Sequence, residues 1–273
     1  MELRPGYKQT EVGVIPEDWE VRALAILTNK IGDGLHGTPR YSPEGAYSFI
    51  NGNNLVRGRI EITPDTRAVS HEEFQKHGVP LGASTLLMSI NGTIGNTAMY
   101  HGEPVVLGKR AASLNVLPRV SRIFLYYCLG MPLLQSHFSD AQTGTTIKNL
   151  GLAAIRASEI PLPPLPEQKA IAEALSDVEA LIESQEQLIA KKKQIKQGAM
   201  QELLTGKRRL PRFEKAGFRR TDVGSIPENW DISPIAQCTD YVDYRGKTPA
   251  KATTGILLVT ARNIRMGYID YNT

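Results

Sequence analysis

Short apolar runs separated by turn residues fill most of the first 120 or so positions of the chain. Four such runs are bounded by Gly, Pro or Asn and are typical of strands, at 46–50, 84–90, 97–102 and 112–117. The segments 121–130 and 131–138 have helical spacing instead, and Pro132 is well placed to begin the second helix. The first part of the chain is therefore predicted to mix helices and strands.

A proline cluster at 160–168 is the clearest boundary in the sequence. Proline fixes φ and removes a backbone donor, so an extended hinge is predicted there. From Pro166 to about Thr205 the chain is rich in Ala, Glu, Gln, Lys and Leu, which predicts one long helix that Gly206 can cap. At 1.5 Å per residue, about 38 residues span roughly 57 Å.

One face of this predicted helix is apolar, with the seven-residue steps that are typical of paired helices. A helix that packs only on its own domain is the alternative. The positions expected to pair with a second helix are Ile171, Leu175, Val178, Leu181, Ile182, Leu188, Ile189, Ile195 and Leu203.

The chain contains a long internal repeat. The segment YKQTEVGVIPEDWEV at 7–21 recurs as FRRTDVGSIPENWDI at 218–232, and weaker similarity continues from Asn54 to Ile60 against Asn263 to Ile269. A period near 210 residues indicates a duplicated domain rather than a solenoid. Only residues 218–273 represent the second copy, so the chain is expected to stop within it, roughly 150 residues short of an equal copy.

Charge is concentrated in two adjacent blocks within a chain of formal net charge +4. Residues 167–190 carry one basic and six acidic side chains, whereas residues 191–220 carry eleven basic and two acidic ones. The basic block is either a solvated face or a contact with a polyanion. No apolar run is long enough for a membrane span and the first residues lack a signal core, so we expect a cytoplasmic protein without a membrane partner.

Patterns that would indicate an active site fail on inspection. The GDGLHG segment at 32–37 is followed by prolines where a nucleotide-binding fold needs a helix. Glu72 and Glu73 do not complete a nuclease motif, and the five histidines lack metal-ligand spacing. Cys128 and Cys238 are too far apart in sequence for a zinc finger, and two cysteines make no disulfide framework. We therefore expect no catalytic residues, no metal site and no cofactor.

Five polar loops remain, at 37–42, 51–59, 89–96, 108–113 and 143–149, and their residue types suit DNA. Arg can bind guanine edges, Asn adenine edges, and Lys, Thr and backbone N–H groups phosphates. Ordinary turns are the alternative for any single loop. The residues expected to face DNA are Thr38, Arg40, Asn53, Asn54, Asn91, Thr93, Lys109, Arg110, Thr145, Lys148 and Asn149.

These segments together resemble the specificity (S) subunit of type I restriction-modification enzymes. The resemblance rests on TEVGVIPEDWEV, GTPRY, SINGTIGNTAMY, TGTTIKNLGL, IPLPPLPEQKAIAEAL and KKKQIKQGAMQELLTGKRRLPRF. It implies two target-recognition domains, each followed by a long helix, with each domain reading half of a split site in double-stranded DNA. It also implies that methyltransferase (M) subunits dock on the chain and that a restriction and translocase (R) subunit joins them. S-adenosylmethionine, ATP and Mg²⁺ would belong to those partners.

The predicted fold is α+β, with a mixed α/β recognition domain at 1–160, a hinge and spacer helix at 161–206, and a basic linker with the start of a second recognition domain at 207–273. The second spacer helix is not in this sequence, so two chains are expected to pair their helices head to tail as a homodimer. The alternatives are a non-functional truncated relic, a coiled-coil scaffold without nucleic acid, and a free-standing nuclease or methyltransferase.

Overall fold

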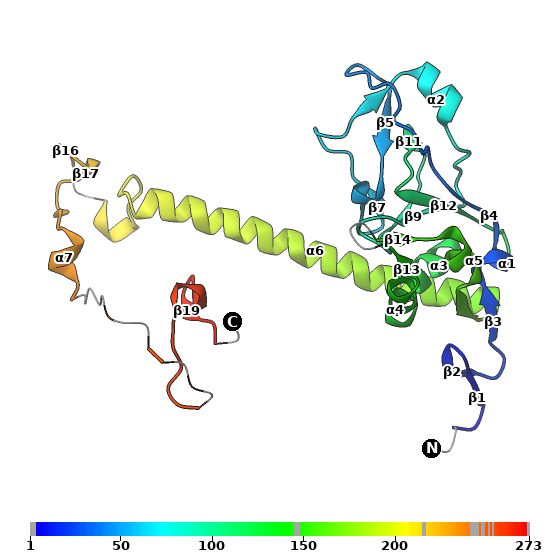
Figure 1. The fold of residues 1–273 in the computed structure, drawn as a ribbon. Coiled ribbons are helices and arrows are strands. Elements are labelled where there is room, and N and C mark those ends of the chain that lie inside the picture. The colour runs from blue at the N-terminus through cyan, green and yellow to red at the C-terminus, as the bar shows by residue number, and fades with distance from the viewer. Residues whose placement is uncertain are drawn as a thin grey trace. The chain divides into compact units, whose positions relative to one another are not determined.

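The computed structural model describes residues 4–144, 148–214, 217–240, 246, 249–250, 252 and 254–271. The chain divides into two compact units, Met1–Lys192 and Lys193–Thr273. Figure 1 shows the elements of both along the chain. Within the described part of the chain, no helix is both long enough and apolar enough to cross a membrane.

A four-stranded antiparallel sheet forms the centre of the first unit, in the order β10 (Thr97–Met99), β9 (Thr85–Ser89), β12 (Ala111–Val116) and β4 (Thr28–Asp33). Side chains alternate across a strand, and both faces of β9 are buried. Leu86 and Met88 enter one hydrophobic cluster, whereas Leu87 enters the other. This explains why the β9 sequence reads as a continuous apolar run.

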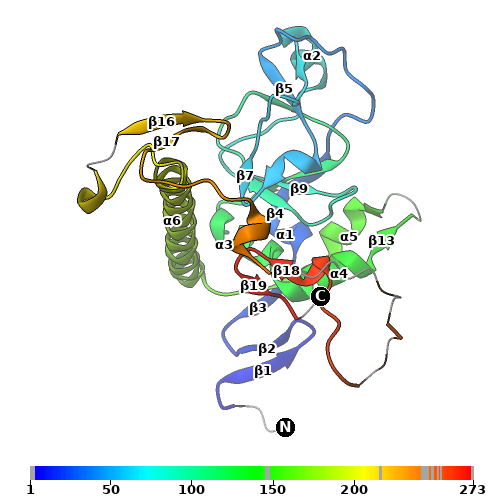
Figure 2. The same cartoon turned by 90° about the vertical axis from the view of Figure 1, so that its left-hand side faces the viewer.

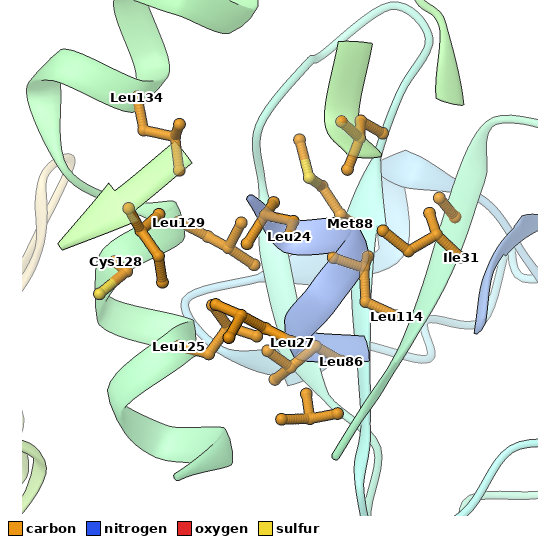
Figure 3. Close-up of a cluster of buried hydrophobic side chains, with 14 of the residues drawn as sticks. Leu24, Leu27, Ile31, Leu86, Met88, Leu114, Leu125, Cys128, Leu129 and Leu134 are labelled. Carbon is orange, nitrogen blue, oxygen red and sulfur yellow. The ribbon is translucent and has the colours of Figure 1, made fainter. Parts of the chain in front are cut away.

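Four helices cover one face of this sheet: α1 (Leu24–Leu27), α3 (Arg122–Leu129), α4 (Pro132–Asp140) and α5 (Leu152–Ala157). Figure 3 shows Leu24 and Leu27 of α1 lying between Leu125 and Leu129 of α3 and Leu86 and Leu114 of the sheet. All six side chains are at most 1% exposed. The core is therefore built from helices packed on a sheet.

The second cluster is covered by a smaller sheet, in the order β11 (Val105–Leu107), β5 (Tyr47–Ile50) and β8 (Ala68–Val69), with β5 and β11 parallel. The short helix α2 (His71–His77) lies beside it, and the hairpin of β6 (Leu55–Val56) and β7 (Arg59–Ile60) follows β5. Two further pairs are β1 (Tyr7–Thr10) with β2 (Gly13–Pro16), and β13 (Gln142–Thr143) with β14 (Asn149–Leu150).

The predicted α+β fold is confirmed. The four predicted strands appear as β5, β9, β10 and β12, and the two predicted helices as α3 and α4, with Pro132 in the first turn. The extended hinge is shorter than the predicted range of 160–168. Its first residues belong to β15 (Glu159–Leu162), which pairs antiparallel with β3 (Glu20–Ala23). Helix α6 then runs from Leu165 to Leu203, one residue earlier at its start than predicted, because prolines are tolerated in a first turn.

The start of α6 is fixed by a buried glutamine. The Gln168 side chain is 2% exposed and bridges two elements. Its Oε1 accepts a hydrogen bond from the Ser121 N–H at 2.9 Å, and its Nε2 donates to the Pro163 carbonyl at 2.8 Å. Ser121 is the N-cap of α3, so one side chain connects the hinge, α3 and α6.

The second unit repeats the opening of the first. Strands β16 (Phe218–Thr221) and β17 (Gly224–Pro227) pair in the register of β1 and β2, and both hairpins are visible in Figure 2. Thr221 Oγ1 donates to the Gly224 carbonyl at 2.7 Å, as Thr10 Oγ1 does to Gly13. The described part of this unit also contains the end of α6, α7 (Ile235–Cys238), two short 3-10 helices at Pro211–Phe213 and Ala261–Asn263, and the hairpin of β18 (Ile264–Arg265) and β19 (Tyr268–Ile269). The sequence repeat is therefore a structural repeat.

Replacing Gln168 by Leu should lower the free energy of unfolding of the first unit by about 2–4 kcal/mol, because two buried backbone groups lose their partners. Urea denaturation followed by circular dichroism measures this change. Gln187→Leu, at an exposed position on the same helix, is the matched control and should change stability by no more than about 0.5 kcal/mol. Equal effects of the two substitutions would contradict the role of the bridge.

Candidate nucleic-acid interface

The polar loops predicted to face DNA adjoin one another in the first unit. Leu35 N–H donates to the Leu107 carbonyl at 2.7 Å, and Lys109 N–H donates to the Leu35 carbonyl at 2.9 Å. These bonds place the loop that carries Thr38 and Arg40 beside the loop of Lys109 and Arg110. Residues more than 70 positions apart in sequence thus share one surface.

Two further loops join the same array. Ile90 N–H donates to the Arg110 carbonyl at 3.0 Å, and Gly92 N–H donates to the Lys148 carbonyl at 3.2 Å. The Asn91 side chain contacts the Asn149 side chain, with an Nδ2–Oδ1 distance of 3.4 Å. The loops after β9 and before β14 therefore lie side by side.

The loop after β5 completes the array through a close backbone approach. A Cβ atom at Gly52 would lie 2.7 Å from the Ser89 Cβ and 3.1 Å from the Arg110 carbonyl oxygen. Only glycine fits between these neighbours without displacing them. Asn53 follows directly and is exposed, so four of the predicted loops adjoin one another. The fifth begins beside Lys109 but then runs to α2, where the Arg40 N–H donates to Glu73 Oε2 at 3.0 Å.

Most of the predicted residues reach the solvent. Thr38, Arg40, Asn53, Thr93, Lys109, Arg110 and Lys148 are exposed, whereas Asn54, Asn91 and Asn149 are half-buried. Thr145 lies outside the described residues. Within the described ranges, no carboxylate lies within 4.0 Å of the charged groups of the four cations in this set, Arg40, Lys109, Arg110 and Lys148. Their positive charge is available to an external anion.

Asn54 is committed to its own loop. Its Oδ1 accepts a hydrogen bond from Asn51 N–H at 3.0 Å, and its Nδ2 donates to the Glu61 carbonyl at 3.0 Å and to Thr66 Oγ1 at 3.2 Å. In the second unit Asn263 makes the equivalent bonds to Thr260 and Asp270. The same asparagine recurs in the second copy of the repeat, and this recurrence indicates from the sequence that the residue has a structural role.

Two arginines in the same segment face helix α6 instead. Arg59 forms a bidentate ion pair with Glu183, with N–O distances of 3.0 and 2.9 Å, and Arg57 contacts Glu186 at 2.6 Å. Arg57 has a φ of 46°, which the tight β6–β7 turn imposes. Neither arginine was in the predicted DNA-facing set, but their ion pairs were not predicted, because the carboxylate partners are more than 120 positions away.

Two tyrosines of α3 also hold α6. Tyr127 Oη donates to Glu179 at 2.8 Å and lies 3.2 Å from Ser176 Oγ, while Tyr126 Oη is 3.5 Å from Glu179. Burial, with added repulsion from Glu179, raises the pKa of Tyr126 to about 12. Tyr126 and Tyr127 line a groove of about 760 Å³ together with Arg57, Arg59, Glu179 and Glu183.

Other chemistry-bearing side chains do not converge. Within the described residues no group of three or more His, Cys, Asp or Glu is placed to hold a metal ion. Cys128 is buried, and burial raises the pKa of its thiol to about 12, so it is not a thiolate at neutral pH. Cys238 is exposed.

A family model described as "Type I restriction modification DNA specificity domain" matches residues 16–195, which include all five loops and the first four-fifths of α6. The chain belongs to this family. The predicted resemblance is thereby confirmed, and the loop array described above is a feature of a specificity domain.

Individual relatives extend beyond this specificity domain. The type I restriction enzyme MjaX specificity subunit of Methanocaldococcus jannaschii is 30% identical over 90% of the chain and 59% of its own length. The MjaVIII specificity subunit of the same organism is 27% identical over 95% of the chain and 58% of its length. The chain thus spans about three fifths of the curated relatives it matches.

One solved structure supports the fold. It concerns complex assembly and conformational transition of the type I R-M system, and one of its chains aligns with a TM-score of 0.50 at 21% identity. The alignment covers 69% of this chain and 46% of that chain. At this level of identity the likeness shows the fold alone.

Replacing Tyr126 by Phe tests the contact between α3 and α6. At pH 11 an ordinary tyrosine is about nine-tenths ionised, whereas the raised pKa keeps Tyr126 mostly neutral. The folded state binds the Tyr126 proton more tightly than the unfolded state does. This difference favours the folded state below pH 10, and the contribution is lost as the pH rises through about 12. Tyrosine absorbance at pH 11 should therefore show almost the same phenolate content for wild type and variant. A deficit of nearly one phenolate in the variant would refute the raised pKa.

Proposed function

We propose that this chain is the DNA-recognition component of a type I restriction-modification system, in which the domain at residues 1–160 reads one half of a bipartite site. The observation that supports this most strongly is a set of adjoining loops that carry Lys109, Arg110 and Lys148, with Arg40 on a neighbouring loop, none of whose side-chain charges has a carboxylate within 4.0 Å among the described residues. Unpaired cations on adjoining loops of a specificity domain suit a DNA backbone and its base edges.

The different residue types on this surface suit different parts of the DNA. Lys109 and Lys148 contact phosphates, and Arg40 and Arg110 are the candidates for guanine because a guanidinium can bind O6 and N7 together. Asn53 carries an exposed amide that matches adenine, whereas the amide of Asn91 is half-buried and already contacts Asn149. Asn54 holds the loop in shape and is left out of the reading set, because its side chain is already used within the loop.

Catalysis is proposed to reside in other subunits. The chain would act as an adaptor on which methyltransferase subunits dock and which a translocating restriction subunit joins, with S-adenosylmethionine, ATP and Mg²⁺ bound by those partners. This division of work agrees with the cations and amides that the described loop residues offer, which suit binding to DNA.

The apolar stripe of α6 is proposed to pair two chains. Val178, Leu181, Ile182, Leu188, Ile189 and Ile195 are between 47% and 59% exposed. At about 100° per residue, Ile182 and Ile189 lie about a quarter turn from Ala172 and Glu183, which contact the first unit. Docking on the domain packs Ile171 against the first cluster but leaves these six positions exposed, and a second α6 running antiparallel would bury them.

A symmetric pair of chains would read a site whose halves are inverted copies. The decisive experiment incubates the purified chain with its cognate methyltransferase subunit and a random DNA library, then maps the methylated adenines. An inverted split motif supports both recognition and pairing. An asymmetric motif would mean that another protein supplies the second half, and no methylation by a well-folded chain would contradict the proposal.

Binding of the free chain separates DNA recognition from a coiled-coil scaffold. Arg110→Gln should weaken binding to the mapped site by about 1–3 kcal/mol if Arg110 reads guanine. Arg59→Gln is the matched control, because Glu183 already neutralises Arg59, and it should leave the affinity almost unchanged. Fluorescence anisotropy at several salt concentrations measures both. Equal losses for the two variants, or no salt dependence in wild type, would count against the loop surface.

Charge placed on the stripe should separate the chains. Ile189→Glu is expected to convert a dimer at micromolar concentration into a monomer, because it buries a carboxylate in an apolar seam. Gln187→Glu adds the same charge away from the stripe and should leave the dimer intact. Light scattering distinguishes the two masses, and a monomeric wild-type chain would rule out helix pairing.

A further inference from the structure

The two copies of the repeated hairpin have the same backbone but different neighbours. In each, a short antiparallel pair leads into a Pro-acid-polar-Trp turn, and the Trp N–H donates to the proline carbonyl, at 3.1 Å for Trp19 and 3.0 Å for Trp230. Gly13 and Gly224 have φ values of 109° and 110°. The backbone that presents the tryptophan is therefore alike in the two copies.

The second hairpin covers the C-terminal end of α6. Gly206, with a φ of 70°, is buried against it, and a Cβ there would lie 2.4 Å from Pro227 Cδ. The Arg209 guanidinium lies 5.4 Å from the centre of the Trp230 ring, and its Nη1 donates to Asn229 Oδ1 at 3.0 Å. The hairpin thus binds a helix end by apolar contact, cation–π contact and one hydrogen bond.

The first hairpin lies at the N-terminal end of α6 and, within the described residues, has no C-terminal helix end packed on its proline. Pro16, the counterpart of Pro227, is only half-buried, whereas Pro227 is buried. Trp19 Nε1 donates to Glu167 Oε2 at 3.1 Å, which places the indole at the start of α6. Asp18 replaces Asn229, is exposed, and forms no hydrogen bond or ion pair with the described residues.

The charge of the first hairpin matches a helix end better than that of the second. Its turn, EDWE at 17–20, carries three acidic residues, whereas ENWD at 228–231 carries two. The end of α6 carries Lys207, Arg208 and Arg209 in succession. A carboxylate in place of the Asn229 amide turns a neutral acceptor into a charged one, which strengthens a bond from a guanidinium.

We propose that the first hairpin of one chain docks on the C-terminal end of α6 of a second copy of the chain, with Pro16 on Gly206 and with Arg209 against Trp19 and Asp18. The proposal rests on the antiparallel helix pairing proposed above. In that pairing the end of one helix lies at the start of the other, and Trp19 already contacts the start of α6.

This docking places two hairpins in competition for one helix end. The β16–β17 hairpin follows Arg209 by fewer than ten residues, so its local concentration at the helix end is high, on the order of millimolar. The β16–β17 hairpin therefore limits docking from a second chain. The first hairpin of that second chain competes for the helix end through the carboxylate of Asp18. The end of α6 consequently exchanges between a contact within the chain and a contact between chains.

The test measures the dimer dissociation constant of full-length variants by sedimentation velocity, in wild type and in a Trp230→Ala background that weakens the contact within the chain. Trp230→Ala alone should tighten the dimer. In that background Asp18→Arg should weaken the dimer roughly tenfold, because a symmetric dimer contains the ion pair twice. Adding Arg209→Asp to Asp18→Arg should restore most of the affinity by reversing the pair.

Glu11→Arg is the matched control, since it reverses a charge at the far end of the same hairpin. If Asp18→Arg behaves like Glu11→Arg in both backgrounds, or the double reversal does not rescue, the docking is refuted while helix pairing stands. If neither background dimerises, helix pairing fails as well. Asn229→Ala repeats the test where Trp230→Ala impairs folding, and it should tighten the dimer in the same direction.

Discussion

The docking of the first half of α6 on α3 is the interaction on which the rest of the chain depends. Gln168 is buried where the hinge meets the helix, Tyr126 and Tyr127 contact Glu179 about three turns further along, and Arg59 and Arg57 reach Glu183 and Glu186. The contacts become more exposed along this series, so the free energy is concentrated at the buried glutamine. This gradient fixes the direction of the helix at its base and leaves its outer part free to bind another surface.

The sequence predicted those features that depend on neighbours along the chain. Apolar runs between turn residues located β5, β9, β10 and β12, and composition located α6 to within two residues. The short α1 and α5 were not predicted, because segments of four to six residues carry too little periodicity. Their side chains are nevertheless central, since Leu24 and Ile155 are fully buried.

The candidate interface shows the limit of sequence reasoning more clearly. Arg57, Arg59 and Arg110 look alike in the sequence, yet two of them are neutralised by carboxylates on α6 and one is not. Such pairing is set by tertiary contacts that no local pattern encodes. Asn54 is different, because comparison with Asn263 within the same chain reveals a structural position without any second protein.

The central strand β9 has both faces buried. In the loop that follows it, Ile90 belongs to the first hydrophobic cluster and Ile94 packs against it, whereas the polar residues Asn91 and Thr93 belong to neither cluster. The residues that stabilise the fold and the residues that shape the polar surface are therefore almost separate sets. Substitutions at Thr93 or Arg110 change that surface while leaving the packing around Leu86, Leu87 and Met88 intact. A scaffold with this separation can diversify its surface through many sequence changes, because few of them affect folding.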